Sequence, residues 1–146
     1  MVLTDRSKCV LVTAVIIGCL GGCGGPSSST QTASGPNQAA ALQEVGEMYR
    51  AYLVQKKKPP TSVKDFKGME QIAPLGMSQL SEGKIVAVWG VQLTDLSEEG
   101  SNDSSTEVLA YAKDVPEKGG EVLMKNRTVK TMTADEFKAA PKAAGK

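Results

Sequence analysis

The chain has 146 residues, with 17 Lys and Arg against 16 Asp and Glu, no histidine and three cysteines. That length predicts one domain rather than two. A formal net charge of +1 excludes the broad basic field of a protein that coats nucleic acid, and the lack of histidine removes the commonest general base and metal ligand. All three cysteines fall within the first 23 residues, so none belongs to the predicted folded body.

The N-terminus has the layout of a signal peptide. A weakly positive segment, residues 1–8, precedes the uncharged apolar run of residues 9–20. A permanent membrane-spanning helix needs about 20 apolar residues, so this run is too short for one and suits the core of a signal peptide. The apolar run ends in a short motif of an aliphatic residue, two small residues and a cysteine: Leu20, Gly21, Gly22 and Cys23.

This motif resembles the lipobox of bacterial lipoproteins, in which the cysteine becomes the mature N-terminus. The resemblance implies that the Cys23 thiol carries the lipid and that a signal peptidase cleaves between Gly22 and Cys23. The segment ending in Cys19 fits the same pattern with a shorter apolar run, so Cys19 is the alternative acceptor. Cys23 is preferred because a leucine lies three residues before it and the polar linker follows it directly. An ordinary secreted protein or a short membrane anchor is the other interpretation.

Cleavage at this site would divide the chain into a signal peptide over residues 1–22 and a mature protein with 15 basic and 15 acidic residues. That balance offers no electrostatic argument for an acidic substrate. Residues 23–37 comprise the lipidated cysteine and a Gly/Ser/Pro-rich flexible linker with a root-mean-square reach of about 20 Å. A single domain is expected over residues 38–140, followed by a disordered tail over residues 141–146.

The first expected element of the domain is a long helix over residues 38–55. Asn37 is a candidate N-cap, and Pro59 and Pro60 stop the helix. Gly46 would admit a close-packed neighbour. The apolar residues recur at three- and four-residue spacing and form one stripe: Leu42, Val45, Tyr49, Tyr52 and Leu53.

Little regular structure is predicted for the chain between the long helix and residue 84. Ser62 and Asp65 have the spacing of a capping box and predict a short second helix. Residues 69–83 are weakly patterned, and Pro74 and Gly76 indicate a loop.

From residue 84 onward the sequence predicts strands. Residues 85–91 form a β-branched apolar run typical of a buried strand, and residues 107–112 predict a second one. Residues 121–125 and 128–132 flank Asn126 and Arg127, which favours a hairpin with a two-residue turn. Pro116, Gly119 and Gly120 predict a turn, and Thr133 with Glu136 forms a capping box that opens a short closing helix.

These elements predict an α+β fold, in which the long N-terminal helix packs on a small antiparallel sheet of three or four strands. Six segments within residues 38–140 carry a further likeness: 49–52, 59–66, 88–91, 108–111, 119–124 and 129–137. Through them the body is similar to a set of small uncharacterised bacterial lipoproteins with a pseudopilin-like domain, related to the major pseudopilins of type II secretion. True pseudopilins have an unbroken helix from membrane to body, whereas here a linker intervenes. The hairpin turn also departs, with Asn126 and Arg127 where relatives usually have Asp-Gly.

Three groups of residues are candidates for binding chemistry, and a plain structural role is favoured for each. The acidic loop around Asp95–Asp103 offers oxygen ligands for Ca²⁺ but fits a solvated connection. Lys56–Lys58 would suit anionic lipid or nucleic acid, or a solvated helix terminus. Tyr49, Tyr52 and Trp89 would form a ligand platform or a core. We predict no catalytic residue, metal site or cofactor.

The sequence therefore predicts a non-enzymatic lipoprotein of the cell envelope, held on the periplasmic side or the cell surface by its N-terminal lipid. Its expected partners are the membrane and an envelope protein, with no nucleic acid. One alternative is a small-ligand or substrate-binding lipoprotein whose pocket is lined by Trp89 and the tyrosines. Another is a pseudopilin-like component associated with secretion or pili. A carboxylate-based enzyme is the weakest alternative.

Overall fold

The computed structural model describes residues 36–97 and 105–145. These residues form an α+β fold, which confirms the predicted class and the antiparallel sheet. The elements in chain order are α1 (Pro36–Lys56), the 3-10 helix η1 (Val63–Phe66), α2 (Pro74–Ser81), β1 (Ile85–Ala87), β2 (Val108–Ala112), α3 (Val115–Lys118), β3 (Gly120–Met124), β4 (Val129–Met132) and α4 (Ala134–Ala139).

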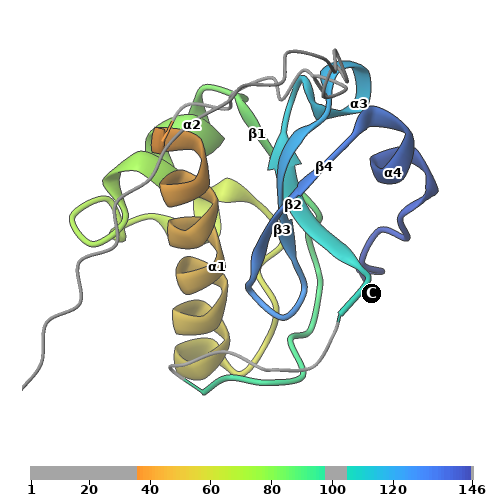
Figure 1. Ribbon diagram of the computed structural model, residues 1–146. Coiled ribbons are helices and arrows are strands. Elements are labelled where there is room, and N and C mark those ends of the chain that lie inside the picture. Colours follow the sequence, from red (N-terminus) through yellow and green to blue (C-terminus); the bar gives the residue numbers. More distant parts are fainter. Residues whose placement is uncertain (1–35, 98–104, 146) are drawn as a thin grey trace, which may run out of the picture.

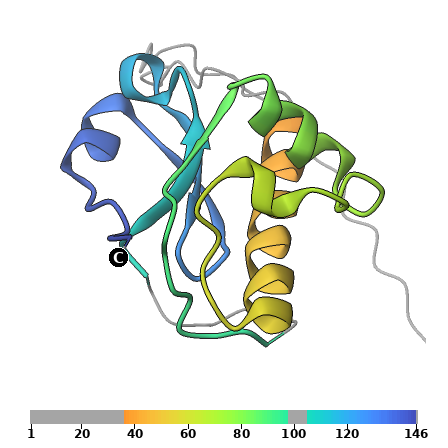
Figure 2. The ribbon, with the colours of Figure 1, turned by 180° about the vertical axis from the view of Figure 1, so that it is seen from behind.

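The sheet is a four-stranded antiparallel meander in the order β1-β2-β3-β4. Its register pairs Ile85 with Ala112, and Leu123 with Val129. Helices cover both faces: α1 and α2 lie on one side of the sheet and α4 on the other (Figure 1). The view from behind shows η1 and the chain that follows it beside α1 (Figure 2). The sheet therefore has two buried faces, and each has its own hydrophobic cluster.

The larger cluster fills the space between α1 and the sheet. Tyr49, Leu42 and Val45 are completely buried there against Ala110 and Leu123. Leu123 lies so close to α1 that its Cδ1 atom would be 3.4 Å from a Cβ placed on Gly46. This confirms that Gly46 admits a close neighbour. The second cluster packs under α4 on the other face of the sheet and comprises Val108, Ala112, Val115, Val122, Met124 and Phe137.

Both predicted capping boxes are present. Thr133 and Glu136 behave as predicted: the Thr133 backbone amide donates to Glu136 Oε2 at 2.7 Å, and Glu136 N donates to Thr133 Oγ1 at 3.2 Å. In the first box, Asp65 Oδ2 accepts from the amides of Thr61 and Ser62 at 2.7 and 3.1 Å. These bonds hold the pKa of the Asp65 carboxyl below its usual value. The box opens η1, a single turn of 3-10 helix, so the predicted short second helix is present.

Two predictions for the middle of the chain are wrong. The expected loop over residues 69–83 contains α2, because Pro74 occupies the first turn of that helix, where proline is well tolerated. Gly76 lies within α2 against α1, and a Cβ there would be 3.0 Å from Glu44 Cβ. The expected strand over residues 85–91 ends at Ala87. Beyond it Gly90 adopts a positive φ of 74° and its amide bonds Pro60 O at 2.8 Å, so the chain turns out of the sheet.

The turns also differ from expectation. Asn37 lies within α1, which begins at Pro36, so it is not an N-cap. The segment around Pro116 forms the short helix α3. The β3–β4 hairpin has a three-residue loop over residues 125–127, since Met124 N bonds Thr128 O at 2.8 Å and Arg127 N bonds Met124 O at 2.9 Å. Arg127 takes the left-handed conformation that such loops require, with φ 68°.

The C-terminal segment is ordered over residues 141–145, so the prediction of a disordered tail is wrong there. Val108 N donates to Pro141 O, and Ala143 N donates to Val108 O, each at 2.9 Å. Lys142 Nζ lies 3.9 Å from the centre of the Phe137 ring and donates to Phe137 O at 2.6 Å. Backbone pairing with β2 and a cation–π contact with Phe137 therefore fix this segment beside the start of β2.

Gly119 provides a test of the α3–β3 junction. Its φ of 72° and ψ of 177° are accessible mainly to glycine, and a Cβ would lie 2.7 Å from Met132 O. We expect Gly119→Ala to lower the free energy of unfolding by about 2–3 kcal/mol. Gly83→Ala is the matched control, because Gly83 has a similar φ of 69° but nothing within 4 Å of its Cβ position. It should cost about 1 kcal/mol in urea titrations. Equal losses for the two variants would contradict the predicted clash.

Candidate functional site

The predicted lipidation residues Cys19, Gly22 and Cys23 lie outside the described residues. In the part of the chain that is described, no helix is both long and apolar enough to cross a membrane. The described residues therefore leave the lipid anchor as a prediction. A candidate site must be sought on the surface of the folded body.

The aromatic residues predicted as a ligand platform are brought together, but in the core. Tyr49 stacks on Trp89 with ring centroids 6.0 Å apart and meets the edge of Phe66 at 5.4 Å. Tyr52 is 6.1 Å from the same Phe66 ring. The Tyr49 hydroxyl donates to Val88 O at 2.5 Å, and burial raises the pKa of that hydroxyl well above its usual value. The cluster packs three chain segments together, with Tyr49, Tyr52 and Phe66 buried and Trp89 partly buried against them.

A shallow groove runs along the outer side of α1 instead. It consists of two hollows of about 300 and 320 Å³ that meet at Ile72. The first hollow is lined by Ala40, Gln43, Glu44, Glu47, Met48, Ile72 and Ala73. The second is lined by Ala51, Gln55, Lys67, Gly68, Met69 and Ile72. We refer to these residues together as the α1 groove.

The far wall of the α1 groove is the chain between η1 and α2. Successive turns form it, in which the amides of Ile72 and Ala73 both bond Met69 O, at 3.1 and 2.9 Å. Glu44 Oε2 accepts the amide of Gly76 at 2.8 Å and ties α2 to α1. This wall leaves the Ile72 side chain 72% exposed, the highest value among the large hydrophobic residues described as exposed. Sequence reasoning missed the site because its two walls come from segments that are far apart in the sequence; Met69 and Ile72 were the available signal.

Charge in the α1 groove is unevenly balanced. Near its first hollow, Glu47 pairs with Arg50 at 2.8 Å and with Arg127 at 2.7 Å. The Arg127 side chain is only 5% exposed and also donates to the Ser97 carbonyl oxygen. At the other hollow, Lys67 has no ion pair among the described residues. The exposed Ile72 therefore forms an apolar ridge between two different ends of the groove. The charge of Glu47 is neutralised at one end, and Lys67 makes the other end cationic.

The other cavity and the acidic loop are weaker candidates for a binding site. A more open cavity of about 520 Å³ at the end of the sheet is lined by both signs of charge, and its Lys84 and Glu82 pair with each other at 2.5 Å. Asp95 accepts bonds from Ser97 N and Oγ, which lower the pKa of its carboxyl; residues 98–104 of that acidic loop lie outside the described residues. Within the described ranges, no three His, Cys, Asp or Glu side chains gather as metal ligands would.

No protein-family model, curated protein or solved structure matches this chain. The likeness to pseudopilin-like lipoproteins therefore stays a prediction. The function is inferred from the described surface and from the sequence that precedes it.

The core role of Tyr49 can be tested with a matched pair of tyrosines. Tyr49→Phe removes the bond to Val88 O, and we expect a loss of about 1 kcal/mol in the free energy of unfolding. Tyr111→Phe is the control, because Tyr111 packs on Phe137 at 4.6 Å and its hydroxyl has no hydrogen bond within the described residues. Its unfolding free energy should change by less than about 0.5 kcal/mol. An unchanged Tyr49→Phe variant would contradict the structural role of this hydroxyl.

Proposed function

We propose that this chain is a non-enzymatic lipoprotein of the cell envelope that holds a partner protein in its α1 groove. The observation that carries the proposal is the 72% exposure of Ile72 at the junction of two hollows. An isolated exposed apolar residue needs no explanation. Ile72 is different because Met69 lies one turn before it in the same wall and Leu75, 38% exposed, follows on α2. Together they form the kind of apolar patch that a partner covers.

The anchor in this proposal is the lipid on Cys23, with Cys19 as the alternative. It is supported by the order of apolar run, lipobox-like motif and polar linker. Two or more acyl chains hold a protein stably at a membrane where one chain does not. Tethering also raises the effective concentration of the groove for any partner on the same membrane into the millimolar range. A shallow groove of modest affinity would therefore suffice for binding.

The shape of the α1 groove favours a protein partner over a small ligand. Each hollow is at the lower limit of the volumes typical of ligand pockets, and Ile72 projects between them. The aromatic residues that would line a ligand pocket are already packed in the core. A helix or loop with side chains on both sides of Ile72 would fill the two hollows at once.

We also propose that the body is pseudopilin-like, because a helix followed by an antiparallel meander is the order of elements in that family. In a secretion or pilus assembly the α1 groove would then face a neighbouring subunit. This remains the alternative to a free envelope lipoprotein, and the identity of the groove's partner distinguishes the two.

The anchor is tested by mass spectrometry of the protein from membranes. We expect a mature N-terminus at Cys23 that carries a diacylglycerol and acyl chains, because cleavage follows Gly22. Cys23→Ser should leave the precursor uncleaved and unlipidated, whereas Cys19→Ser should be processed like the wild type. An unmodified Cys23 thiol would remove the anchor, and the opposite behaviour of the two variants would assign it to Cys19.

The groove is tested by site-specific photocrosslinking in intact cells. A photoreactive residue at Gln43, which is exposed in the first hollow, should give an adduct with one discrete protein. Ile72→Asp should reduce that adduct at least tenfold, because it places a charge on the apolar ridge. Val54→Asp is the matched control, since Val54 is 43% exposed but lies outside the groove. The groove would be excluded as the contact surface if the two aspartate variants gave equal yields.

A further inference from the structure

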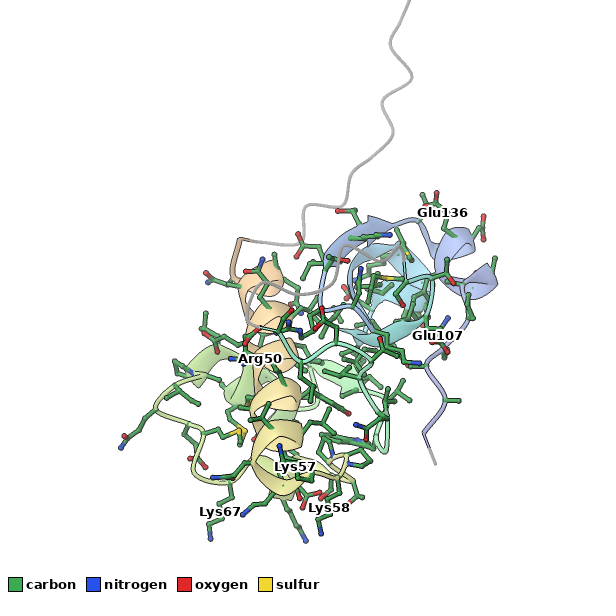
Figure 3. All side chains as sticks on the ribbon, turned by 90° about the horizontal axis from the view of Figure 1, so that it is seen from below. Arg50, Lys57, Lys58, Lys67, Glu107 and Glu136 are labelled. Atoms are coloured by element: carbon green, nitrogen blue, oxygen red, sulfur yellow. The ribbon has the colours of Figure 1, made fainter. Side chains whose placement is uncertain are left out.

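Four exposed lysines gather at the C-terminal end of α1: Lys56, Lys57, Lys58 and Lys67. We call them the basic end. Seen from below, the side chains of Lys57, Lys58 and Lys67 project outward around the end of the helix, while Glu107 and Glu136 lie on the far side of the molecule (Figure 3). Lys67 belongs to this group although it comes from the chain after η1, and it lines the same hollow as Gln55 of α1. The sequence alone showed only the three consecutive lysines.

Two carboxylates near the basic end bond backbone amides rather than these lysines. Asp65 accepts the amides of Thr61 and Ser62, and Glu70 Oε2 accepts the amide of Gly68 at 2.8 Å. None of the four lysines forms an ion pair within the described residues. The four lysines of the basic end are therefore available to an anion outside the folded body.

Lys57 has a backbone conformation that glycine adopts more easily than lysine does. Its φ is 57°, and its amide bonds Leu53 O at 2.9 Å, which is the left-handed conformation that follows a helix. Glycine takes this conformation without strain, whereas a residue with a Cβ does not. Backbone geometry thus gives no reason for a lysine at this position. A cation at the C-terminal end of a helix complements the helix dipole, and the exposed Lys57 side chain is also available to a partner outside the folded body.

The choice of lysine over arginine indicates the type of partner. The two arginines of the described residues, Arg50 and Arg127, pair with Glu47 inside the protein. Arginine is suited to bidentate recognition of a fixed carboxylate, whereas lysine is a mobile point charge. Clusters of four to eight basic residues are typical of proteins that bind anionic lipid head groups. A diffuse anionic surface therefore fits the basic end better than a single acidic side chain.

We propose that the basic end docks on the anionic head groups of the membrane that holds the lipid anchor. This proposal depends on the proposed function in one respect only, because it assumes the lipid anchor. The 21 residues of α1 are about 31 Å long, and the chain from Cys23 to Pro36 can extend to about 45 Å. The linker can therefore run back beside the helix while the basic end touches the membrane. In that orientation α1 stands upright and the α1 groove opens sideways, with Lys67 at its membrane end.

The test uses the full lipidated protein in vesicles of phosphatidylcholine alone or with 30% phosphatidylglycerol. Amine-reactive labelling followed by mass spectrometry measures the accessibility of each lysine. We expect Lys57, Lys58 and Lys67 to be protected in the anionic vesicles at low salt and exposed again at 1 M salt, where charges are screened within about 3 Å. The internal controls are Lys118 and Lys130, exposed lysines on other elements, whose labelling should not change.

Lys57→Gly separates docking from folding. Each lysine near an anionic surface contributes about a fivefold gain in binding, so the protection of Lys58 and Lys67 should fall about fivefold. Thermal unfolding should be unchanged or occur at a higher temperature, because glycine relieves the backbone strain at this position. Lys130→Gln is the matched control and should leave the protection unchanged.

Protection that is equal in both vesicle types, or absent from both, would overturn the proposal. Protection by added polyglutamate but not by anionic vesicles would also overturn it, in favour of an acidic protein partner. The intact mass of the sample reports the anchor separately. If the protein carries no lipid, the anchor fails, and protection by added anionic vesicles still decides the docking.

Discussion

The fold depends on the complete burial of Tyr49 between three segments that are distant in the sequence. Its ring contacts Phe66 of η1 and Trp89 beyond β1, and its hydroxyl bonds Val88 O. Aromatic side chains bury more apolar area than aliphatic ones, and a buried hydroxyl must also find a partner. One residue of α1 therefore draws both connecting segments under the helix. The early end of β1 follows from this contact, because the chain must leave the sheet to bring Trp89 to the ring.

The same contact explains why α1 has an open outer side. The helix α1 gives one face to the sheet and packs against η1 and α2 as well, and the chain between η1 and α2 lies along the side that remains. That chain is held by its own turns at Met69 and by the bond from Gly76 to Glu44, so it lies beside the helix rather than over it. The α1 groove is the space left between them. Ile72 is exposed there because the hydrophobic cluster beneath α1 is already filled.

Local signals in the sequence predicted local structure well. The apolar stripe ending at Tyr52 and Leu53 and the capping box at Thr133 depend on contacts within one or two helical turns. Several of the failures involve long-range contacts. Gly76 and Pro74 look like loop residues until α1 is known to lie against them, and the final segment looks polar until Lys142 is seen to cover Phe137. The groove was unpredictable for the same reason, since its two walls are far apart in the sequence. The predicted lipid acceptor lies outside the described residues.

The proposed lipid anchor, the basic end and the α1 groove would together constrain how such a protein can work. A lipid anchor alone would limit the distance of the body from the membrane but would not set its orientation. A partner in the same membrane meets the α1 groove efficiently only if the groove faces sideways. Electrostatic contact at the end of α1 would supply that orientation, because the basic end and the groove share Lys67. The contact would be weakened by salt, whereas the lipid would not. The orientation of the body would then depend on the salt concentration, whereas its retention at the membrane would not.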